Sequence, residues 1–223
     1  MRNCIKICEL FDLSHTAARP LLEKYEYPWQ ALAEIRPFVA ALCEALKNDE
    51  NYDFPAPDVA IHKTAKVHPS ANIAGPCVVG AGTEVRPCAF LRGDVLIGEN
   101  CVIGNSCEFK NAVIFDDCQV PHFNYVGDSI LGYHAHMGAG AVTSNVKGDR
   151  SNVVIKDGER EYETGRYKVG AFLGDYAEIG CNSVLNPGAI VGRGARVYPL
   201  SMVRGVVPEQ TIYKRLGDVV VKY

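Results

Sequence analysis

The sequence lacks several features that would place it in large classes of protein. Its 223 residues contain no apolar run near the roughly 18 residues that a membrane helix needs. The N-terminal stretch has no apolar core followed by a small-residue cleavage site, so it does not indicate a secretory signal. The formal net charge of −3 leaves no basic excess for nucleic-acid binding. These absences favour a cytoplasmic protein that binds neither membranes nor nucleic acids.

Disulfide bonds are also disfavoured, although the chain has nine cysteines. The number is odd, no Cys-x-x-Cys pair occurs, and the chain is longer than the small secreted domains that depend on disulfides. Cysteine is among the residue types most often buried. We therefore expect reduced thiols that serve as small core residues.

The first 57 residues differ in pattern from the rest. Pro28 and Pro37 each open a short stretch with apolar residues at helical spacing, and proline suits the first turn of a helix. Those apolar residues are Leu32, Ile35, Val39, Leu42 and Leu46. The segment NDENYDFPAPD that follows is polar and proline-rich, which is typical of a linker. The sequence predicts a short N-terminal helical segment and linker over residues 1–57.

A six-residue repeat of aliphatic residues begins at Ile61 and continues, with one interruption, to Val203. Its first run is Ile61, Val67, Ile73, Val79, Val85, Leu91, Ile97, Ile103 and Phe109. A small residue often stands four places after the aliphatic one, and four of these small residues are Cys77, Cys101, Cys107 and Cys118. A period of six fits short flat strands joined by tight corners and fits neither a helix nor a single strand. Residues 58–223 are therefore predicted to form an all-β domain, a parallel β-helix of hexapeptide repeats.

Residues 144–170 interrupt this repeat with a long charged loop. Asp157-Gly158, between VVIK and EREY, is typical of a hairpin turn. A long loop that interrupts a regular solenoid is more often functional than decorative. We expect the loop, with Arg166 and Lys168 near its end, to close over a cofactor and meet its phosphates.

The repeat allows neighbours in space to be predicted from residue numbers. Three hexapeptides form one coil, so residues 18 apart should stack at the ~4.8 Å spacing of a β-ladder. Arg92 and Lys110 are 18 apart and both follow an inward residue, which should place two cations side by side. Such a pair suits a phosphate bound between the two cations. Two solvated side chains that splay apart remain the alternative.

Three histidines are candidates for chemistry. His122 is a possible general base, because imidazole often serves this role near neutral pH, although a single surface histidine is more often an ordinary polar residue. Allowing for one five-residue rung, Ala139 should stack on it. His134 and His136 raise a weak possibility of zinc, since no carboxylate accompanies them. We predict no metal site.

The segment PHFNYVGDSILGYHAHMGAGAVTSN resembles the acetyltransferase domain of the bifunctional bacterial enzyme that makes UDP-N-acetylglucosamine. The matching elements are His122, Tyr125, Val126-Gly127-Asp128, Gly138-Ala139-Gly140 and Asn145. LRGD and FKN, around Arg92 and Lys110, fall where that family keeps its phosphate-binding arginine and lysine. YETGRYKVGAFLGD is closer to archaeal bifunctional sugar-1-phosphate nucleotidyltransferase/acetyltransferases. The likeness covers roughly residues 60–210.

The resemblance implies an acetyl-CoA-dependent N-acetyltransferase that acts on a hexosamine 1-phosphate (glucosamine- or galactosamine-1-phosphate) in nucleotide-sugar biosynthesis. It also implies that the β-helix is left-handed and that the protein is a homotrimer. His122 and Asn145 take the catalytic roles, with His122 removing a proton from the sugar amine that attacks the thioester. The substrate-binding residues implied are Arg92, Lys110, Tyr125 and His136. The cofactor-binding residues implied are Ala139, Val146, Cys181 and Pro199.

One departure leaves the identity of the sugar open, because the bacterial family has an asparagine at the position of His136. The chain also has no glycine-rich nucleotide loop in its N-terminal 57 residues, so we do not expect it to make nucleotide sugars by itself. A non-catalytic trimeric β-helix module that partners a separate sugar nucleotidyltransferase is the alternative function. A zinc hydratase of the carbonic-anhydrase type is disfavoured, because the spacing of the three histidines does not suit it.

Overall fold

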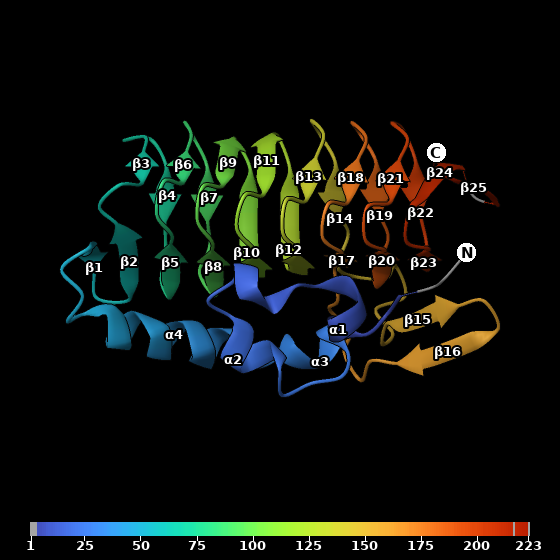
Figure 1. The fold of residues 1–223 in the computed structure, drawn as a ribbon, viewed down its shortest axis with the longest axis horizontal. Helices are drawn as coiled ribbons and strands as arrows, with labels where there is room; N and C mark the ends of the chain where they lie inside the picture. Colours follow the sequence, from blue (N-terminus) through green and yellow to red (C-terminus); the bar gives the residue numbers. More distant parts are fainter. Residues whose placement is uncertain (1–3, 216, 223) are drawn as a thin grey trace.

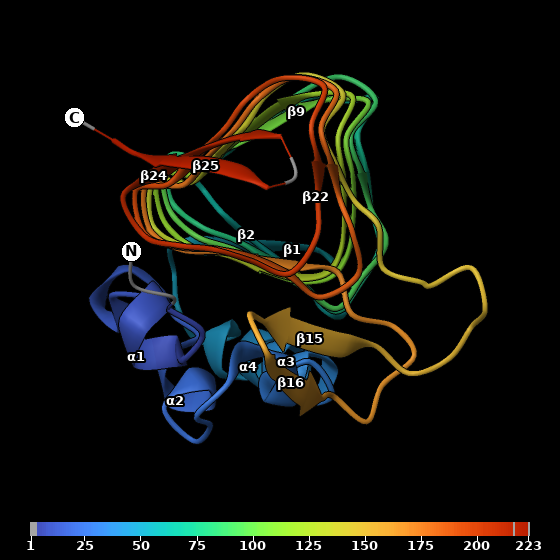
Figure 2. The same ribbon diagram turned by 90° about the vertical axis from the view of Figure 1, so that its right-hand side faces the viewer.

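A β-solenoid makes up most of the computed structural model, which describes residues 4–215 and 217–222 (Figure 1). About nine turns of short strands stack into a three-sided prism, and the turns wind with a left hand along the chain (Figure 2). The prediction of an all-β, left-handed parallel β-helix with a short N-terminal helical segment is confirmed. No helix in the described residues is long and apolar enough to cross a membrane.

Each side of the prism is a ladder of parallel strands, and β10 (Glu108–Ile114) and β12 (Tyr125–Leu131) bend around a corner to serve two sides. The covered face, on which the N-terminal helices lie, also contains β2 (Val59–His62), β5 (Cys77–Val79), β8 (Val95–Ile97), β17 (Ala171–Leu173), β20 (Ala189–Val191) and β23 (Val206–Val207). The second face contains β3 (Lys66–Val67), β6 (Glu84–Val85), β9 (Val102–Asn105), β11 (Gln119–His122), β13 (His136–Met137), β18 (Glu178–Ile179), β21 (Arg196–Val197) and β24 (Thr211–Arg215). The third face also contains β4 (Asn72–Ile73), β7 (Phe90–Leu91), β14 (Val142–Thr143), β19 (Val184–Leu185) and β22 (Met202–Val203).

The inward residues of the repeat form the core that the sequence predicts. Leu91 pairs with Phe109 and Phe109 with Val126, and all three side chains are fully buried. The four cysteines in the small inward positions are buried, and all nine cysteines are free thiols. Burial raises the pKa of the Cys101 thiol to about 12, because a thiolate would lose its hydration there. These cysteines therefore act as small apolar core residues, as expected.

The N-terminal segment supplies α1 (Ile7–Leu10), a 3₁₀ turn (Leu13–His15), α2 (Arg19–Leu22), α3 (Pro28–Ala31) and α4 (Ile35–Leu46). Pro28 opens α3 as predicted, whereas α4 begins two residues before Pro37. The helix α4 buries Ile35, Val39 and Cys43 against the covered face, where it contacts β5, β8 and β10. The segment interpreted as a linker instead contains β1 (Tyr52–Ala56), which pairs antiparallel with β2 and extends the covered face.

The loop of residues 144–170 forms a hairpin of β15 (Val154–Asp157) and β16 (Arg160–Glu163). Its turn residues are Gly158 and Glu159, one place later than expected, and Gly158 has the left-handed φ of +61° that such a turn requires. The Tyr162 ring lies 5.5 Å from Tyr27 and 6.0 Å from Trp29, measured between ring centroids. The hairpin is thus held beside α3 of the N-terminal segment (Figure 2).

Candidate active site

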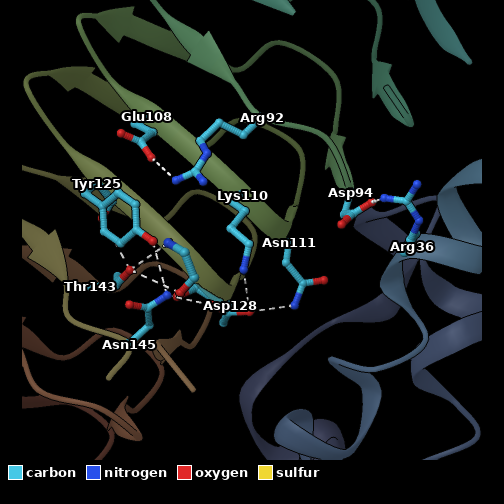
Figure 3. A network of polar contacts seen from close by, with 12 residues as sticks. Arg36, Arg92, Asp94, Glu108, Lys110, Asn111, Tyr125, Asp128, Thr143 and Asn145 are labelled. Atoms are coloured by element: carbon cyan, nitrogen blue, oxygen red, sulfur yellow. Dashed lines mark hydrogen bonds and ion pairs between the residues drawn. The ribbon is translucent and has the colours of Figure 1, made fainter. Parts of the chain in front are cut away.

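The predicted stacking of Arg92 on Lys110 is confirmed by the ladder between β7 and β10. Leu91 pairs with Phe109, and the Arg92 amide donates to the Phe109 carbonyl at 2.8 Å. Neither cation is left unpaired, however. Arg92 Nη1 donates to Glu108 Oε1 at 2.6 Å, and Lys110 Nζ lies 3.5 Å from Asp128 Oδ1 (Figure 3). Carboxylates of the same chain therefore offset the repulsion between these cations.

Gly127 continues this outward column after Lys110, with which it pairs in the ladder. A Cβ atom at residue 127 would collide with the Tyr125 hydroxyl, so glycine leaves the space that the tyrosine ring occupies. From there the Tyr125 hydroxyl accepts a hydrogen bond of 3.1 Å from Asn145 Nδ2. Burial raises the pKa of Tyr125, which keeps the hydroxyl protonated and able to donate to a ligand.

Asp128 joins these side chains into one network (Figure 3). It is 2% exposed, and its carboxylate accepts hydrogen bonds from Asn145 Nδ2 at 2.6 Å and from Asn111 Nδ2 at 2.9 Å. Both N–H bonds of the Asn145 amide are thus used, one by Asp128 and one by Tyr125. In this orientation Asn145 offers its carbonyl oxygen as an acceptor, and its side chain has no N–H left for an oxyanion.

Three residues to which the sequence patterns assigned no role also reach this corner. Asp94, Asn111 and Asp128 occupy one corner position in successive coils, each with a left-handed φ between 48° and 58°. Asn and Asp tolerate that conformation better than other residues with a Cβ atom. Asp94 binds Arg36 of α4 at 2.9 Å. The pairs GD, KN and GD at corresponding places in three repeats were the signal available in the sequence.

His122 ends β11, at the corner between the second and third faces. It is exposed, and its ring has no hydrogen-bond or ion-pair partner among the residues that the structure describes. Its backbone is held firmly, because the amide donates to Asn124 Oδ1 at 3.1 Å and the carbonyl accepts from the Gly140 amide at 3.0 Å. The ring is therefore free to take a proton from a ligand.

The predicted cofactor residues divide between two edges of the third face. Pairing of Gln119 with His136 places Ala139 on His122 as expected, and the same ladder continues to Cys181 and Pro199. These four residues form a single column along one edge. A groove of about 440 Å³ beside it is lined by Cys181, Pro199 and His136, whose ring binds Glu178 at 3.0 Å. His136, predicted to bind substrate, thus lies with cofactor candidates.

The other three predicted cofactor residues lie near the opposite edge. Val146 lines a cavity of about 680 Å³ between the hairpin and the third face, together with Asn186 and Arg204. Arg166 and Lys168 line a separate groove of about 460 Å³ that also contains Lys110. The structure thus brings Arg166 and Lys168 to the residue expected to hold the sugar phosphate. No cluster of metal-binding side chains occurs in residues 4–215 and 217–222.

Comparison with known proteins finds a family model and curated relatives that match parts of this chain. Residues 73–159 match the family described as the GMPPB C-terminal domain. The bifunctional sugar-1-phosphate nucleotidylyltransferase/acetyltransferase of Sulfurisphaera tokodaii is 34% identical over 145 residues, covering 65% of this chain and 36% of that protein. The bifunctional protein GlmU of Methanococcus maripaludis is 28% identical over 198 residues, covering 88% and 48%. The chain therefore spans less than half the length of these curated relatives.

Solved structures with a similar course of the chain include two acetyltransferases. A putative acetyltransferase from Bacillus cereus aligns with a TM-score of 0.41 and 16% identity, covering 74% of this chain and 77% of that chain. The acetyltransferase domain of PglB from Neisseria gonorrhoeae, in complex with acetyl coenzyme A, aligns with a TM-score of 0.31 and 17% identity, covering 70% and 53%.

Proposed function

We propose that this chain, which resembles the acetyltransferase domain of bifunctional sugar-1-phosphate nucleotidylyltransferase/acetyltransferases, is an acetyl-CoA-dependent N-acetyltransferase of a hexosamine 1-phosphate. The observation that carries this proposal is the network of Tyr125, Asn145, Asp128 and Lys110. It begins three residues after His122, whose ring has no partner among the described residues. The base thus lies at one edge of the third face and the amide and the cation lie at its other edge, so edges of two neighbouring chains would together form the site.

In this proposal His122 acts as the general base. The amino group of the hexosamine loses a proton to the imidazole, and the amine nitrogen attacks the carbonyl carbon of the thioester. The carbon–sulfur bond then breaks, and the departing CoA thiolate receives the proton from the imidazolium. The products are the N-acetyl sugar phosphate and CoA. The carbonyl oxygen of Asn145 is suited to accept a hydrogen bond from the amine, since its N–H bonds are already used.

Arg92, Lys110 and Tyr125 are proposed to hold the phosphate of the sugar. The 3.5 Å separation between Lys110 and Asp128 is long for a hydrogen bond, so Lys110 keeps N–H donors for a phosphate oxygen. Tyr125 accepts a hydrogen bond from Asn145 and retains its own O–H to donate. Glucosamine 1-phosphate and galactosamine 1-phosphate differ in the direction of one hydroxyl, and both suit these contacts.

Acetyl-CoA is proposed to contact both edges of the third face. Ala139, Cys181 and Pro199 lie along one edge and Val146 lies at the other, so two neighbouring chains would each contribute one edge to a cofactor site. The third face and its edges expose large apolar side chains, which is typical of an interface. These are Phe90 at 42%, Phe123 at 62%, Val184 at 38%, Leu200 at 80% and Met202 at 52%. A homotrimer with sites between chains is therefore part of the proposal. The proposal also places the protein in the cytoplasm.

Release of free thiol from acetyl-CoA in the presence of hexosamine 1-phosphates tests the function. We expect turnover with glucosamine or galactosamine 1-phosphate and an N-acetylated product by mass spectrometry. Glucose 1-phosphate is the matched control, because it has the phosphate but no amine. If the protein is folded and trimeric by light scattering and none of the hexosamine phosphates causes thiol release, the result would favour the non-catalytic module that partners a separate nucleotidyltransferase.

A further inference from the structure

A positively charged groove lies where three distant parts of the chain meet. Its wall includes the start of α4, the corner around which β10 bends and the end of the loop of residues 144–170. Four cations line the groove: Arg36, Lys110, Arg166 and Lys168. Two carboxylates, Asp94 and Asp128, also line it, which leaves a formal charge of 4 − 2 = +2. The groove therefore favours an anion.

The backbone fixes the loop side of this groove. Val146 and Lys168 form an antiparallel bridge, and the Val169 amide donates to the Asn145 carbonyl at 3.0 Å. The Gly170 amide then donates to the Asp128 carbonyl at 2.8 Å. A Cβ atom at residue 170 would collide with the backbone of β12, so only glycine allows this close approach. Arg166 and Lys168 are thus held at a set position relative to Asp128 and Asn145.

The two loop cations that line the groove, Arg166 and Lys168, have no anionic partner among the described residues. Arg166 Nε is buried and has no hydrogen-bond acceptor in the described part of the chain. Lys168 Nζ lies 5.3 Å from the centre of the Tyr167 ring and forms no ion pair with any described residue. The two carboxylates of the groove already have other partners. Asp94 forms an ion pair with Arg36, and Asp128 accepts hydrogen bonds from Asn145 and Asn111. A buried donor without an acceptor is costly, so an anion that supplies one is stabilised here.

We propose that Arg166 and Lys168 bind the phosphate ester of the sugar substrate together with Lys110, and that Arg36 brings the N-terminal segment into this site. This inference rests on the proposed function and changes the expected role of Arg166 and Lys168, which was to meet the phosphates of the cofactor. A phosphate monoester carries about two negative charges near neutral pH and presents three acceptor oxygens. That charge matches the excess of the groove and supplies the acceptor that Arg166 Nε lacks.

Calorimetric titration of the full chain with inorganic phosphate, glucosamine 1-phosphate and CoA, each alone, tests this assignment. For Arg166→Ala and Lys168→Ala we expect phosphate and glucosamine 1-phosphate to bind roughly 10- to 100-fold more weakly, the effect of losing a charge-assisted hydrogen bond. Affinity for CoA should be unchanged. Arg36→Ala should give a smaller loss of the same kind, because that side chain is 67% exposed and shares its charge with Asp94.

Arg160→Ala is the matched control, since it removes an exposed arginine of the same loop that does not line the groove. It should leave all three affinities unchanged. If Arg166→Ala loses as much affinity for CoA as for glucosamine 1-phosphate, or more, Arg166 would be assigned to the cofactor site instead. Unchanged binding of both phosphate ligands would remove the site. If Arg166→Ala does not fold, the partly exposed Lys168→Ala carries the test.

The readout is binding, so its failure is separate from failure of the proposed function. A protein that binds phosphate through Arg166 but releases no thiol from acetyl-CoA keeps this site and loses the acetyltransferase proposal. A protein that acetylates hexosamine phosphates while Arg166→Ala and Lys168→Ala bind them normally keeps the function and loses the site.

Discussion

Asn145 Nδ2 lies 2.6 Å from the carboxylate of Asp128, a side chain that is almost fully buried. The same carboxylate faces Lys110 and accepts from Asn111, so one buried group orients an amide and a cation of the site. Asp128 contacts none of the proposed reacting atoms and is therefore a positioning residue. The network explains why a Gly-Asp pair at this corner matters for more than the turn.

Asp128→Asn should lower kcat roughly 10- to 100-fold, because the loss of a hydrogen bond to a charged group costs about 1.5–3 kcal/mol. The new amide cannot accept as a carboxylate does, so Asn145 should lose its fixed orientation. Steady-state kinetics with a thermal unfolding control measures this change. Asn111→Ala removes a second partner of the same carboxylate and should have a smaller effect on kcat. If Asp128→Asn and the parent have equal turnover, Asp128 serves the turn alone and does not position Asn145 for catalysis.

Arg92→Ala and Lys110→Ala should each raise the KM for the sugar phosphate and change kcat less, with a cost of about 1.5–3 kcal/mol for each lost contact. Glu108→Gln is the informative control, because it removes the negative charge that faces Arg92 at 2.6 Å and keeps the cation. If Arg92 serves the phosphate, Glu108→Gln should leave KM unchanged or lower it. If Arg92 serves only Glu108, the two substitutions should have the same effect.

The repeat made the solenoid predictable. The contacts of the N-terminal segment and of the loop of residues 144–170 could not be predicted in the same way. A period of six sets which residues point inward and which stack, so the pairs of Arg92 with Lys110 and His122 with Ala139 follow from counting. The packing of Tyr162 on Trp29 joins segments with no shared period. The strand β1 replaced an expected linker because an edge strand tolerates proline and polar side chains.

The ion pairs of the site were missed for a similar reason. Counting places Arg92 beside Lys110, but the direction of a long flexible side chain depends on its partners in three dimensions. The carboxylates of Glu108 and Asp128 lie on the next coil in each case, and nothing in the period distinguishes them from the other acidic residues of the chain. The joint position of Arg166 and Lys110 depends on the docking of the whole loop.

Thiol reactivity should follow the pattern of burial. Only Cys8, Cys88 and Cys181 are exposed among the nine cysteines, and burial raises the pKa of Cys101 to about 12. A thiol reagent should therefore titrate three groups in the native protein and nine after denaturation. Acetyl-CoA should protect Cys181 and leave Cys8 and Cys88 reactive. Protection of none of the three would place the cofactor away from the column that contains Ala139 and Pro199.

His122→Ala should lower kcat roughly 10²–10⁴-fold, equivalent to about 3–5 kcal/mol of barrier, and should leave CoA binding nearly unchanged. The imidazole accepts a proton in the proposed step, so its removal should slow the chemical step rather than weaken the binding of either substrate. His134→Ala is the matched control, because His134 is also exposed but stacks on Tyr176 at another corner. It should keep the turnover of the parent. The His122 variant should remain folded, since its ring has no partner in the described residues. A folded His122→Ala protein with parental turnover on hexosamine phosphates would remove this histidine as the base.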